Sequence, residues 1–295
     1  MAGRLPPDLR GVFLAVVASA SFASMHNAIR YVTSDIHPFQ VAFFRTLFGI
    51  LFLVPWFATV GMGSLHTANL GKHLVRAVVN ALSMVAWFAA LSIMPVANAT
   101  SLALAGPIFV ALGAVWLFGE RITRRRSLGI GIAALGALVI IRPGFTEVGL
   151  ATWLVLIASV CVSASKLIAK SLSLTEGTAA IVAYLTFLMM PITLVPALFV
   201  WVWPTPPQLG LLAIIGALGT TGHLLFIKAY KLADVSLVEP VMFMRMVWAA
   251  LIGLVVFAEF PDTWTWIGAA IVVIGTTHLA RREPPVRQHT GDALP

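Results

Sequence analysis

The sequence predicts an all-α integral membrane protein with ten transmembrane helices, arranged as two inverted repeats of five. Three observations support this fold class. The 295 residues are 60% hydrophobic and only 10% charged, with a mean hydropathy of +0.97, whereas soluble domains are about half apolar and a quarter charged. The apolar residues fall into runs long enough to span a bilayer as helices. The two halves of the chain also share one spaced residue pattern.

The predicted spans follow one another with short connectors. Turn-forming residues mark the connectors, such as His37-Pro38, the RPG at 142–144 and the PTPP at 204–207. None of the connectors is long enough to form a soluble domain, so any function lies within the membrane. The expected spans are 10–31, 38–60, 73–94, 97–118, 126–142, 149–170, 177–202, 208–230, 236–258 and 264–281.

The repeat appears as identical residues 139 positions apart. The matching pairs are Glu120/Glu259, Gly129/Gly268, Gly136/Gly275 and Arg142/Arg281. An odd number of spans per half makes the second half enter from the opposite face, an arrangement typical of secondary transporters. The sequence thus predicts a first repeat at 10–142, a second at 149–281, and tails at 1–9 and 282–295. We expect the shared glycines to allow close helix contact rather than to bind a ligand.

The basic residues of the connectors predict the orientation in the membrane. With both termini in the cytoplasm, most Lys and Arg lie on the inner face, as the positive-inside rule requires. The first run resembles a signal peptide, but it continues past the small-residue site through His26 and Ile29, so we expect no cleavage. The inner residues are Arg4, Arg10, Lys72, Arg76, Arg121, Arg124, Arg125, Arg126, Lys170, Lys231, Arg281, Arg282 and Arg287.

Several classes of function are excluded by the residue content. The formal charge of +8 is spread between apolar runs and not gathered on one face, which argues against nucleic-acid binding. The single cysteine, Cys161, has no partner for an intrachain disulfide or a metal site. The chain has no Walker-type loop, HExxH motif or nucleophile elbow. We therefore expect no enzyme activity, no cofactor and no metal.

Two segments carry a family resemblance. The segments 65–144 and 228–275 resemble the drug/metabolite transporter superfamily, in its EamA-like family. HPFQVAFFRTLFG at 37–49 and FAEFPDTWTWIGAAIV at 257–272 look most like the branch with S-adenosylmethionine uptake transporters, and a related branch carries riboflavin. The resemblance implies ten helices around a central cavity in a bacterial inner membrane and a small-molecule substrate. In the superfamily the fifth and tenth spans are associated with dimers, so a homodimer is a further expectation.

Two charged residues mark the ninth predicted span. Arg245 lies nine residues into it, roughly 13 Å along the helix and close to the midplane. A guanidinium there can hold a carboxylate or phosphate, or it can pair structurally within the bundle. Glu239 completes a capping box from Ser236, and its alternative role is a cation or proton site at the inner mouth of a cavity.

Polar residues in other spans are further candidates. His26 and Asn27 lie about two thirds of the way across the first span, where they can bind substrate, titrate or join helices. Arg45 resembles an arginine common at this place in the family, and we expect it to serve packing or gating. His223, in the eighth span, faces either the cavity or a neighbouring helix.

Aromatic and methionine side chains complete the predicted site. Trp87, Trp116, Trp248 and Met242 lie within spans and not in the interfacial belt where tryptophan gathers. Indole faces bind flat rings or cations well. Packing is the competing role for each of them.

Two functions from different classes remain. The first is a secondary transporter of a small organic metabolite by alternating access, with S-adenosylmethionine uptake as one candidate and riboflavin import or amino-acid or drug export as alternatives. The second is a membrane enzyme or assembly subunit whose buried charges are structural. The repeat and the absence of a catalytic motif favour transport.

Overall fold

The computed structural model is a bundle of helices. It describes residues 7–60, 67, 69–118, 124–142, 149–173, 175–176, 178–232 and 241–280. The helices are α1 (Pro7–Val32), α2 (Pro38–Val60), α3 (Leu70–Ile93), α4 (Val96–Ala103), α5 (Gly106–Phe118), α6 (Arg124–Ile141), α7 (Leu150–Ser173), α8 (Thr178–Leu198), α9 (Pro206–Leu232), α11 (Met244–Phe257) and α12 (Thr263–Ala280).

Local sequence explains where α9 and α12 begin. Thr205 precedes α9, and its backbone N–H donates to the side chain of Gln208 at 2.8 Å, while Pro206 occupies the first helical position. Asp262 precedes α12 and accepts hydrogen bonds from the backbone N–H and hydroxyl of Thr265. Both capping arrangements satisfy backbone donors that have no partner in the first turn of a helix.

The fourth predicted span is not one helix. The sequence predicts a continuous run over 97–118, but α4 ends at Ala103 and α5 starts at Gly106. Pro107 has no backbone N–H to donate to the preceding turn. Backbone hydrogen bonds there join residues three positions apart instead of four, such as the bond from the Ala105 N–H to the Leu102 carbonyl at 3.1 Å. The prediction of a single helix in this region was wrong for that reason.

Many of the helices are apolar on the outside as well as inside. Four described helices are long and apolar enough to cross a membrane, and six shorter ones are also apolar. Val255 and Phe199 are each 84% exposed. Such side chains at the surface match a hydrocarbon solvent better than water. The four long segments are Leu9–Val32, Leu70–Ile93, Leu150–Ala169 and Pro206–Phe226.

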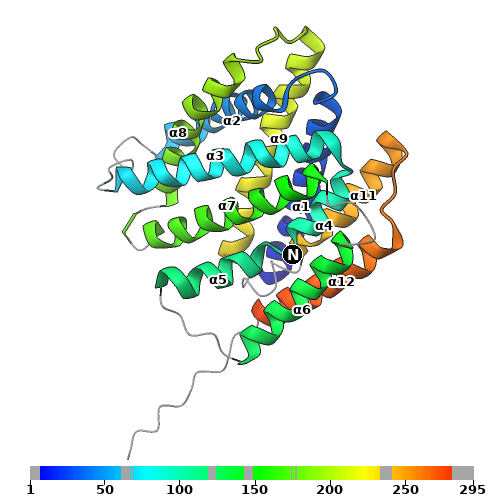
Figure 1. The fold of residues 1–295 in the computed structure, drawn as a ribbon. Coiled ribbons are helices and arrows are strands. Elements are labelled where there is room, and N and C mark those ends of the chain that lie inside the picture. Colours follow the sequence, from blue (N-terminus) through cyan, green and yellow to red (C-terminus); the bar gives the residue numbers. More distant parts are fainter. Residues whose placement is uncertain are drawn as a thin grey trace, which may run out of the picture.

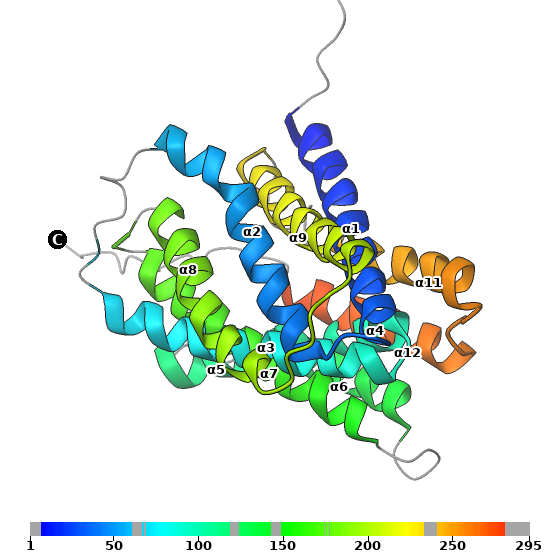
Figure 2. The same ribbon diagram turned by 90° about the horizontal axis from the view of Figure 1, so that it is seen from above.

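Contacts between the two halves of the chain come in matching pairs. Helix α1 of the first half packs against α9 of the second half, and α7 of the second half packs against α3 of the first half (Figure 1). Helix α6 packs along α12. Helix α2 meets both α8 and α9, while α3 meets α8 (Figure 2). If the first five predicted spans are exchanged for the last five, the α1–α9 contact becomes the α7–α3 contact and the α2–α9 contact becomes the α8–α3 contact. The α6–α12 and α2–α8 contacts map onto themselves.

The glycines shared by the two halves bring α6 and α12 together. A Cβ at Gly136 would lie 2.6 Å from the Val272 nitrogen, and a Cβ at Gly268 would lie 2.7 Å from the Gly136 carbonyl oxygen. Likewise, a Cβ at Gly275 would lie 2.5 Å from the Ala133 nitrogen. As expected from the sequence, these glycines allow close helix contact, and the contact lies within one chain.

Candidate functional site

Helix α1 contributes two neighbouring polar residues to the bundle interior. His26 is 6% exposed and Asn27 is 3% exposed. The Asn27 amide donates to the Ala23 carbonyl one turn earlier at 2.9 Å. Its side-chain oxygen and the Nδ1 atom of His26 have no hydrogen-bond partner among the described residues. Buried polar atoms of this kind are uncommon and call for a water, ion or ligand.

Helices α3 and α4 add similar groups nearby. The Trp87 ring lies 5.3 Å from the His26 ring, centroid to centroid, with a tilt of 59°. The Trp87 indole nitrogen and the hydroxyl of the fully buried Thr100 also have no hydrogen-bond partner in the described part of the chain. Helices α1, α3 and α4 all contact one another. We refer to His26, Asn27, Trp87 and Thr100 as the polar cluster.

Helix α11 packs against α1 and contributes three further candidates. The Trp248 indole N–H donates to the Ser19 hydroxyl of α1 at 3.2 Å. Arg245 is half-buried. Met242 is half-buried just before the helix and packs against Ala15 and Ala229. Glu239 and its predicted capping box lie outside the described residues.

The two residues assigned to gating or structure lie on α2 and α9. The Arg45 guanidinium lies against α9, where a Cβ at Gly219 would be 3.3 Å from both Nε and Nη2. The His223 ring packs edge-on against Phe22 of α1, with 5.0 Å between centroids. His223 nevertheless keeps an exposed side chain in the middle of α9. His223 therefore contacts the neighbouring α1, and its role at a cavity stays a prediction.

The aromatic residues divide between the inside and the outside of the bundle. Trp87 and Trp248 are half-buried and pack against the core. Trp116 is 85% exposed and belongs to the outer surface. Trp116 therefore does not join Trp87 and Trp248 at the polar cluster.

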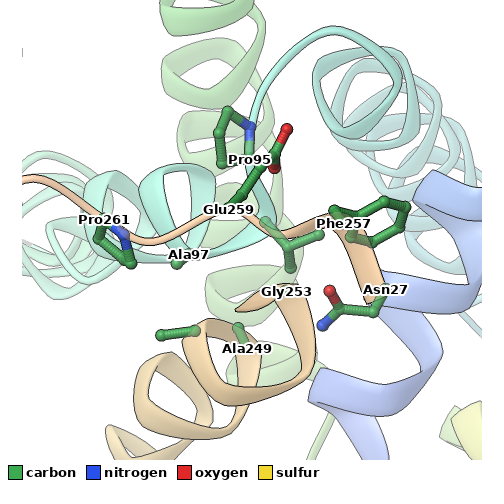
Figure 3. A pocket seen from close by; sticks show the side chains of 10 residues that line it. Asn27, Pro95, Ala97, Ala249, Gly253, Phe257, Glu259 and Pro261 are labelled. Carbon is green, nitrogen blue, oxygen red and sulfur yellow. The ribbon is translucent and has the colours of Figure 1, made fainter. Parts of the chain in front are cut away.

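A small cavity lies beside Asn27. Its free volume is about 10 Å³, which is enough for roughly one water molecule. Figure 3 shows Asn27 projecting from α1 toward Gly253 of α11, where a Cβ would be 3.9 Å from the Asn27 oxygen. The other lining residues are Pro95, Val96, Ala97, Ala249, Ala250, Phe257, Glu259 and Pro261. A metabolite does not fit in this cavity unless the helices move apart.

Ion pairs between the two halves of the chain lie at one end of the bundle, and one of them includes Glu259 of the cavity lining. Arg30, near the end of α1, donates to Glu259 at 2.6 Å, and its guanidinium lies 5.2 Å from the Phe257 ring centre. Arg142, after α6, pairs with Asp262. Each pair joins the first half of the chain to the second. Ala258 adopts a left-handed conformation with φ 54° and ends α11 just before Glu259.

A second cluster links the halves at the opposite helix ends. His73, in the first turn of α3, bonds to Glu176 at 2.5 Å, and the two side chains are 0% and 4% exposed. The Thr67 hydroxyl and the Asn69 amide also donate to Glu176. The Tyr184 ring of α8 stacks on His73 with centroids 4.6 Å apart. We refer to this cluster as the His73–Glu176 latch.

The acidic groups at both ends have lowered pKa values. Burial raises the pKa of Glu176, but hydrogen bonds from Thr67, His73 and Asn69 and the charge of His73 outweigh it. Burial likewise raises the pKa of Asp262, and Thr265 and Arg142 outweigh that effect. Both pKa values end below the ordinary value because the ionised form accepts several bonds. Both carboxylates are thus ionised near neutral pH.

The sequence gives no local signal for the latch. His73 and Glu176 are 103 positions apart, in connectors and a first turn without a motif. Ser19 was missed in the same way, because a single serine in the middle of a span has no distinctive pattern. The described residues contain no group of three or more His, Cys, Asp or Glu that could hold a metal ion.

Known proteins resemble this chain along most of its length. The model of the EamA-like transporter family matches residues 9–142 and again 149–281. A riboflavin transporter from Rhizobium johnstonii is 29% identical over 276 residues, covering 92% of this chain and 91% of that protein. An S-adenosylmethionine uptake transporter from Rickettsia prowazekii is 26% identical and covers 86% of both chains. The pseudopaline exporter CntI from Pseudomonas aeruginosa is 29% identical, covering 92% and 96%.

The fold also occurs among solved structures. A crystal structure superposes with a TM-score of 0.63 at 17% sequence identity, covering 93% of this chain and 96% of the other. The arrangement of helices is therefore shared with a protein of distant sequence.

Proposed function

The chain belongs to the EamA-like transporter family, and on that basis we propose that it moves a small organic metabolite across the bacterial inner membrane by alternating access. Members of this family are transporters and not enzymes. The chain is accordingly a multi-pass membrane protein, with the lipid bilayer as its solvent. The apolar helices and their exposed apolar side chains agree with that setting.

We further propose ten spans in two inverted repeats, 10–142 and 149–281, with both termini in the cytoplasm. The helix contacts support this, because exchange of the halves maps them onto one another. The helix breaks support it too. The helix of the fourth span is broken at Leu104. A second helix break lies at Phe243, just before α11 and 139 positions after Leu104. Interrupted helices in matching places are typical of the substrate region of secondary transporters.

The observation that carries the proposed binding site is the polar cluster. His26, Asn27, Trp87 and Thr100 present buried atoms without hydrogen-bond partners among the described residues. Such atoms cost free energy in an apolar interior unless a ligand or water satisfies them. They lie on α1, α3 and α4, beside α11, which carries Arg245 and Trp248 and is preceded by Met242. Glu239 completes the proposed set.

Alternating access requires contacts that close each end of the pathway in turn. Arg30–Glu259 and Arg142–Asp262 join the halves at the end predicted to face outward. The His73–Glu176 latch joins them at the end predicted to face the cytoplasm. In this structure both sets of contacts are formed.

The relatives suggest three alternatives without choosing among them. S-adenosylmethionine offers a carboxylate, an amine, a sulfonium and adenine to Arg245 and the indole faces. Riboflavin is flat and neutral and uses mainly the aromatic residues. Export of a metabolite is the third alternative. A purely structural or assembly role agrees less well with the family, whose members are transporters. It also leaves the buried polar atoms of the polar cluster, which have no hydrogen-bond partner among the described residues, without a function.

Uptake into liposomes that hold the purified protein tests this proposal. Labelled S-adenosylmethionine is offered, with unlabelled riboflavin, amino acids and S-adenosylhomocysteine as competitors. Saturable uptake of either labelled S-adenosylmethionine or, in a second assay, labelled riboflavin supports transport. Folded protein that gives no saturable flux of any of these solutes in either direction contradicts the proposal.

A pair of tryptophan variants tests the polar cluster. Trp87→Phe keeps an aromatic ring but removes the indole N–H, so we expect KM to rise about fivefold, equivalent to one hydrogen bond of roughly 1 kcal/mol. Trp116→Phe is the matched control, since Trp116 is 85% exposed on the outer surface. Equal KM values for the two variants would place the substrate elsewhere.

A further inference from the structure

Helix α4 begins inside the protein without a capping group. Its N-cap residue is Pro95, which has no side-chain acceptor, and no side chain of the described residues caps the helix. Val96 and Ala97 are buried. The backbone N–H of Ala99 donates to the Pro95 carbonyl at 3.1 Å, but the N–H groups of residues 96–98 have no acceptor in the described part of the chain. A buried helix start with such free donors calls for water or a ligand.

Two oxygens without hydrogen-bond donors border the cavity beside Asn27. The Asn27 Nδ2 donates to the Ala23 carbonyl, and Oδ1 is left buried with no partner among the described residues. A Cβ at Gly253 would lie 3.9 Å from this Oδ1 and 3.8 Å from the backbone carbonyl oxygen of Glu259. No described backbone N–H donates to that carbonyl. Both oxygens therefore border the space that a side chain at Gly253 would fill (Figure 3).

Two helix ends of opposite polarity also line this cavity. Pro95, Val96 and Ala97 belong to the start of α4, while Gly253 and Phe257 belong to the last turns of α11. The start of a helix carries partial positive charge and the end carries partial negative charge. Secondary transporters bind anionic substrate groups at the starts of interrupted helices and cations at helix ends. The cavity is thus suited to an anion on the α4 side and a cation on the α11 side.

The neighbouring ion pair has the same pair of charges. Glu259 lines the cavity, and its carboxylate accepts a hydrogen bond from Arg30 at 2.6 Å. Both side chains are partly exposed. A solute that carries one carboxylate and one ammonium group can bind Arg30 and Glu259 at the same time. Neither charge is then left without a partner when the helices move apart to admit the solute.

Simpler occupants satisfy only part of this site. The free groups are three backbone N–H donors of α4 and two acceptor oxygens. One water makes two to four hydrogen bonds, a simple anion meets only the donors, and a simple cation meets only the oxygens. An amino-carboxylate group meets both sets, because its carboxylate accepts several hydrogen bonds and its ammonium donates three.

We propose that the transported solute carries an α-amino-carboxylate group, as amino acids and S-adenosylmethionine do, and that this group binds at the cavity beside Asn27. Its carboxylate binds at the start of α4, and its ammonium binds the oxygens of Asn27 and Glu259. This assignment rests on the transport function proposed above and requires nothing of Arg245. It ranks riboflavin, which has no such group, below S-adenosylmethionine.

A matched pair of competitors isolates the amino-carboxylate group. S-adenosylhomocysteine and 5′-methylthioadenosine share an adenosine and a thioether sulfur, but only the first carries the amino-carboxylate arm. Both are offered against labelled S-adenosylmethionine in liposomes that hold the purified full-length chain. We expect S-adenosylhomocysteine to inhibit uptake at a concentration about tenfold or more below that of 5′-methylthioadenosine, as one charged hydrogen bond provides. Labelled riboflavin is followed in a parallel assay.

Substitutions in the cavity test where the group binds. Gly253→Ala places a methyl group there at ordinary contact distances, so the fold should be retained while the preference for S-adenosylhomocysteine falls about tenfold. Asn27→Leu keeps the side-chain size but removes Oδ1, and it should have a similar effect. Gly131→Ala is the matched control, because a Cβ there meets nothing within 4 Å. Thermal unfolding of each variant in detergent identifies any loss of folding.

The outcomes separate this inference from the transport proposal. Saturable flux that both competitors inhibit equally, or flux of riboflavin without flux of S-adenosylmethionine, would overturn the amino-carboxylate assignment and leave transport standing. A preference that folded Gly253→Ala and Asn27→Leu both retain would overturn the proposed site. Folded protein without flux of either labelled solute would count against transport itself, and the assignment would fall with it.

Discussion

At the scale of single residues, hydrogen bonds between side chains far apart in the sequence join helices in the interior of the bundle. Ser19 and Trp248 illustrate this, since they are 229 positions apart and join α1 to α11. The Ser19 hydroxyl donates to the Val16 carbonyl at 2.7 Å and accepts from the indole, so both of its roles are used. In an apolar interior each lost partner leaves an unsatisfied polar group.

A double-mutant cycle measures this contact. Ser19→Ala and Trp248→Phe should each lower the free energy of unfolding by about 1 kcal/mol. The double variant should lose little more than either single variant, because the same bond is removed in all three. Thermal unfolding in detergent provides the measurement. Fully additive losses would mean that the two residues act independently.

At the scale of elements, the contact between α6 and α12 depends on glycine. The two backbones approach so closely that the Cβ of any other residue at Gly136 would meet the Val272 nitrogen and the Gly268 carbonyl. Small residues at a helix contact favour association in membranes because dispersion contacts then extend along the backbone. A Cβ added at Gly131, on the same helix, would meet nothing within 4 Å.

The two glycines of α6 give a matched pair of substitutions. Gly136→Ala should lower the free energy of unfolding by about 1 to 3 kcal/mol, as overpacking does. Gly131→Ala should be neutral or stabilise by up to about 1 kcal/mol, since alanine is the better helix former. Thermal unfolding of both variants distinguishes the two effects. Similar losses at both positions would show that the close contact is unimportant.

At the scale of the whole molecule, the two halves meet through polar contacts at both ends of the bundle. The pair of Arg30 and Glu259 joins α1 to the connector after α11, and Arg30 also reaches the Leu91 carbonyl at 3.4 Å. The His73–Glu176 latch joins the opposite helix ends. A transporter that alternates must break one set of contacts while the other holds.

A charge exchange tests the contact at the end predicted to face outward. Arg30→Glu should reduce transport because two carboxylates would then face each other. Glu259→Arg alone should do the same through two guanidinium groups. The double exchange should recover part of the transport rate, since an ion pair is restored while the Leu91 and Phe257 contacts of Arg30 are not. Liposome flux is the measurement, and no recovery would argue against the pair.

The opposite end predicts a dependence of stability on pH. The lowered pKa of Glu176 means that its ionised form contributes stability above the ordinary carboxyl pKa of 4.5. That stability is lost as pH falls from about 4.5 through the lower pKa of the folded state. Unfolding temperature should therefore drop in this acid range, and Glu176→Gln should flatten the change. An unaltered acid profile in the variant would contradict the latch.

The sequence alone determined that the chain is an all-helical membrane protein, and it predicts the division of the chain into two repeats. Apolar runs of sufficient length can only be helices in a bilayer, because no other local structure satisfies their backbone groups there. The helix breaks that the structure shows, at Leu104 and Phe243, are separated by the same 139 positions as the repeat. The break itself was not predicted, since the run over 97–118 stays apolar through Pro107.

The tertiary structure decided which polar residues meet. Hydropathy marks His26, Asn27, Trp87 and Arg45 as unusual within their spans. It does not say which way each helix is rotated about its axis, so it does not predict which side chains these residues contact. Trp116 and Trp87 have the same sequence character, and only packing puts one outside and the other beside His26. His73 and Glu176 are joined by helix packing across 103 positions. Contacts at such separations arise from the meeting of helix faces, which a single sequence does not specify.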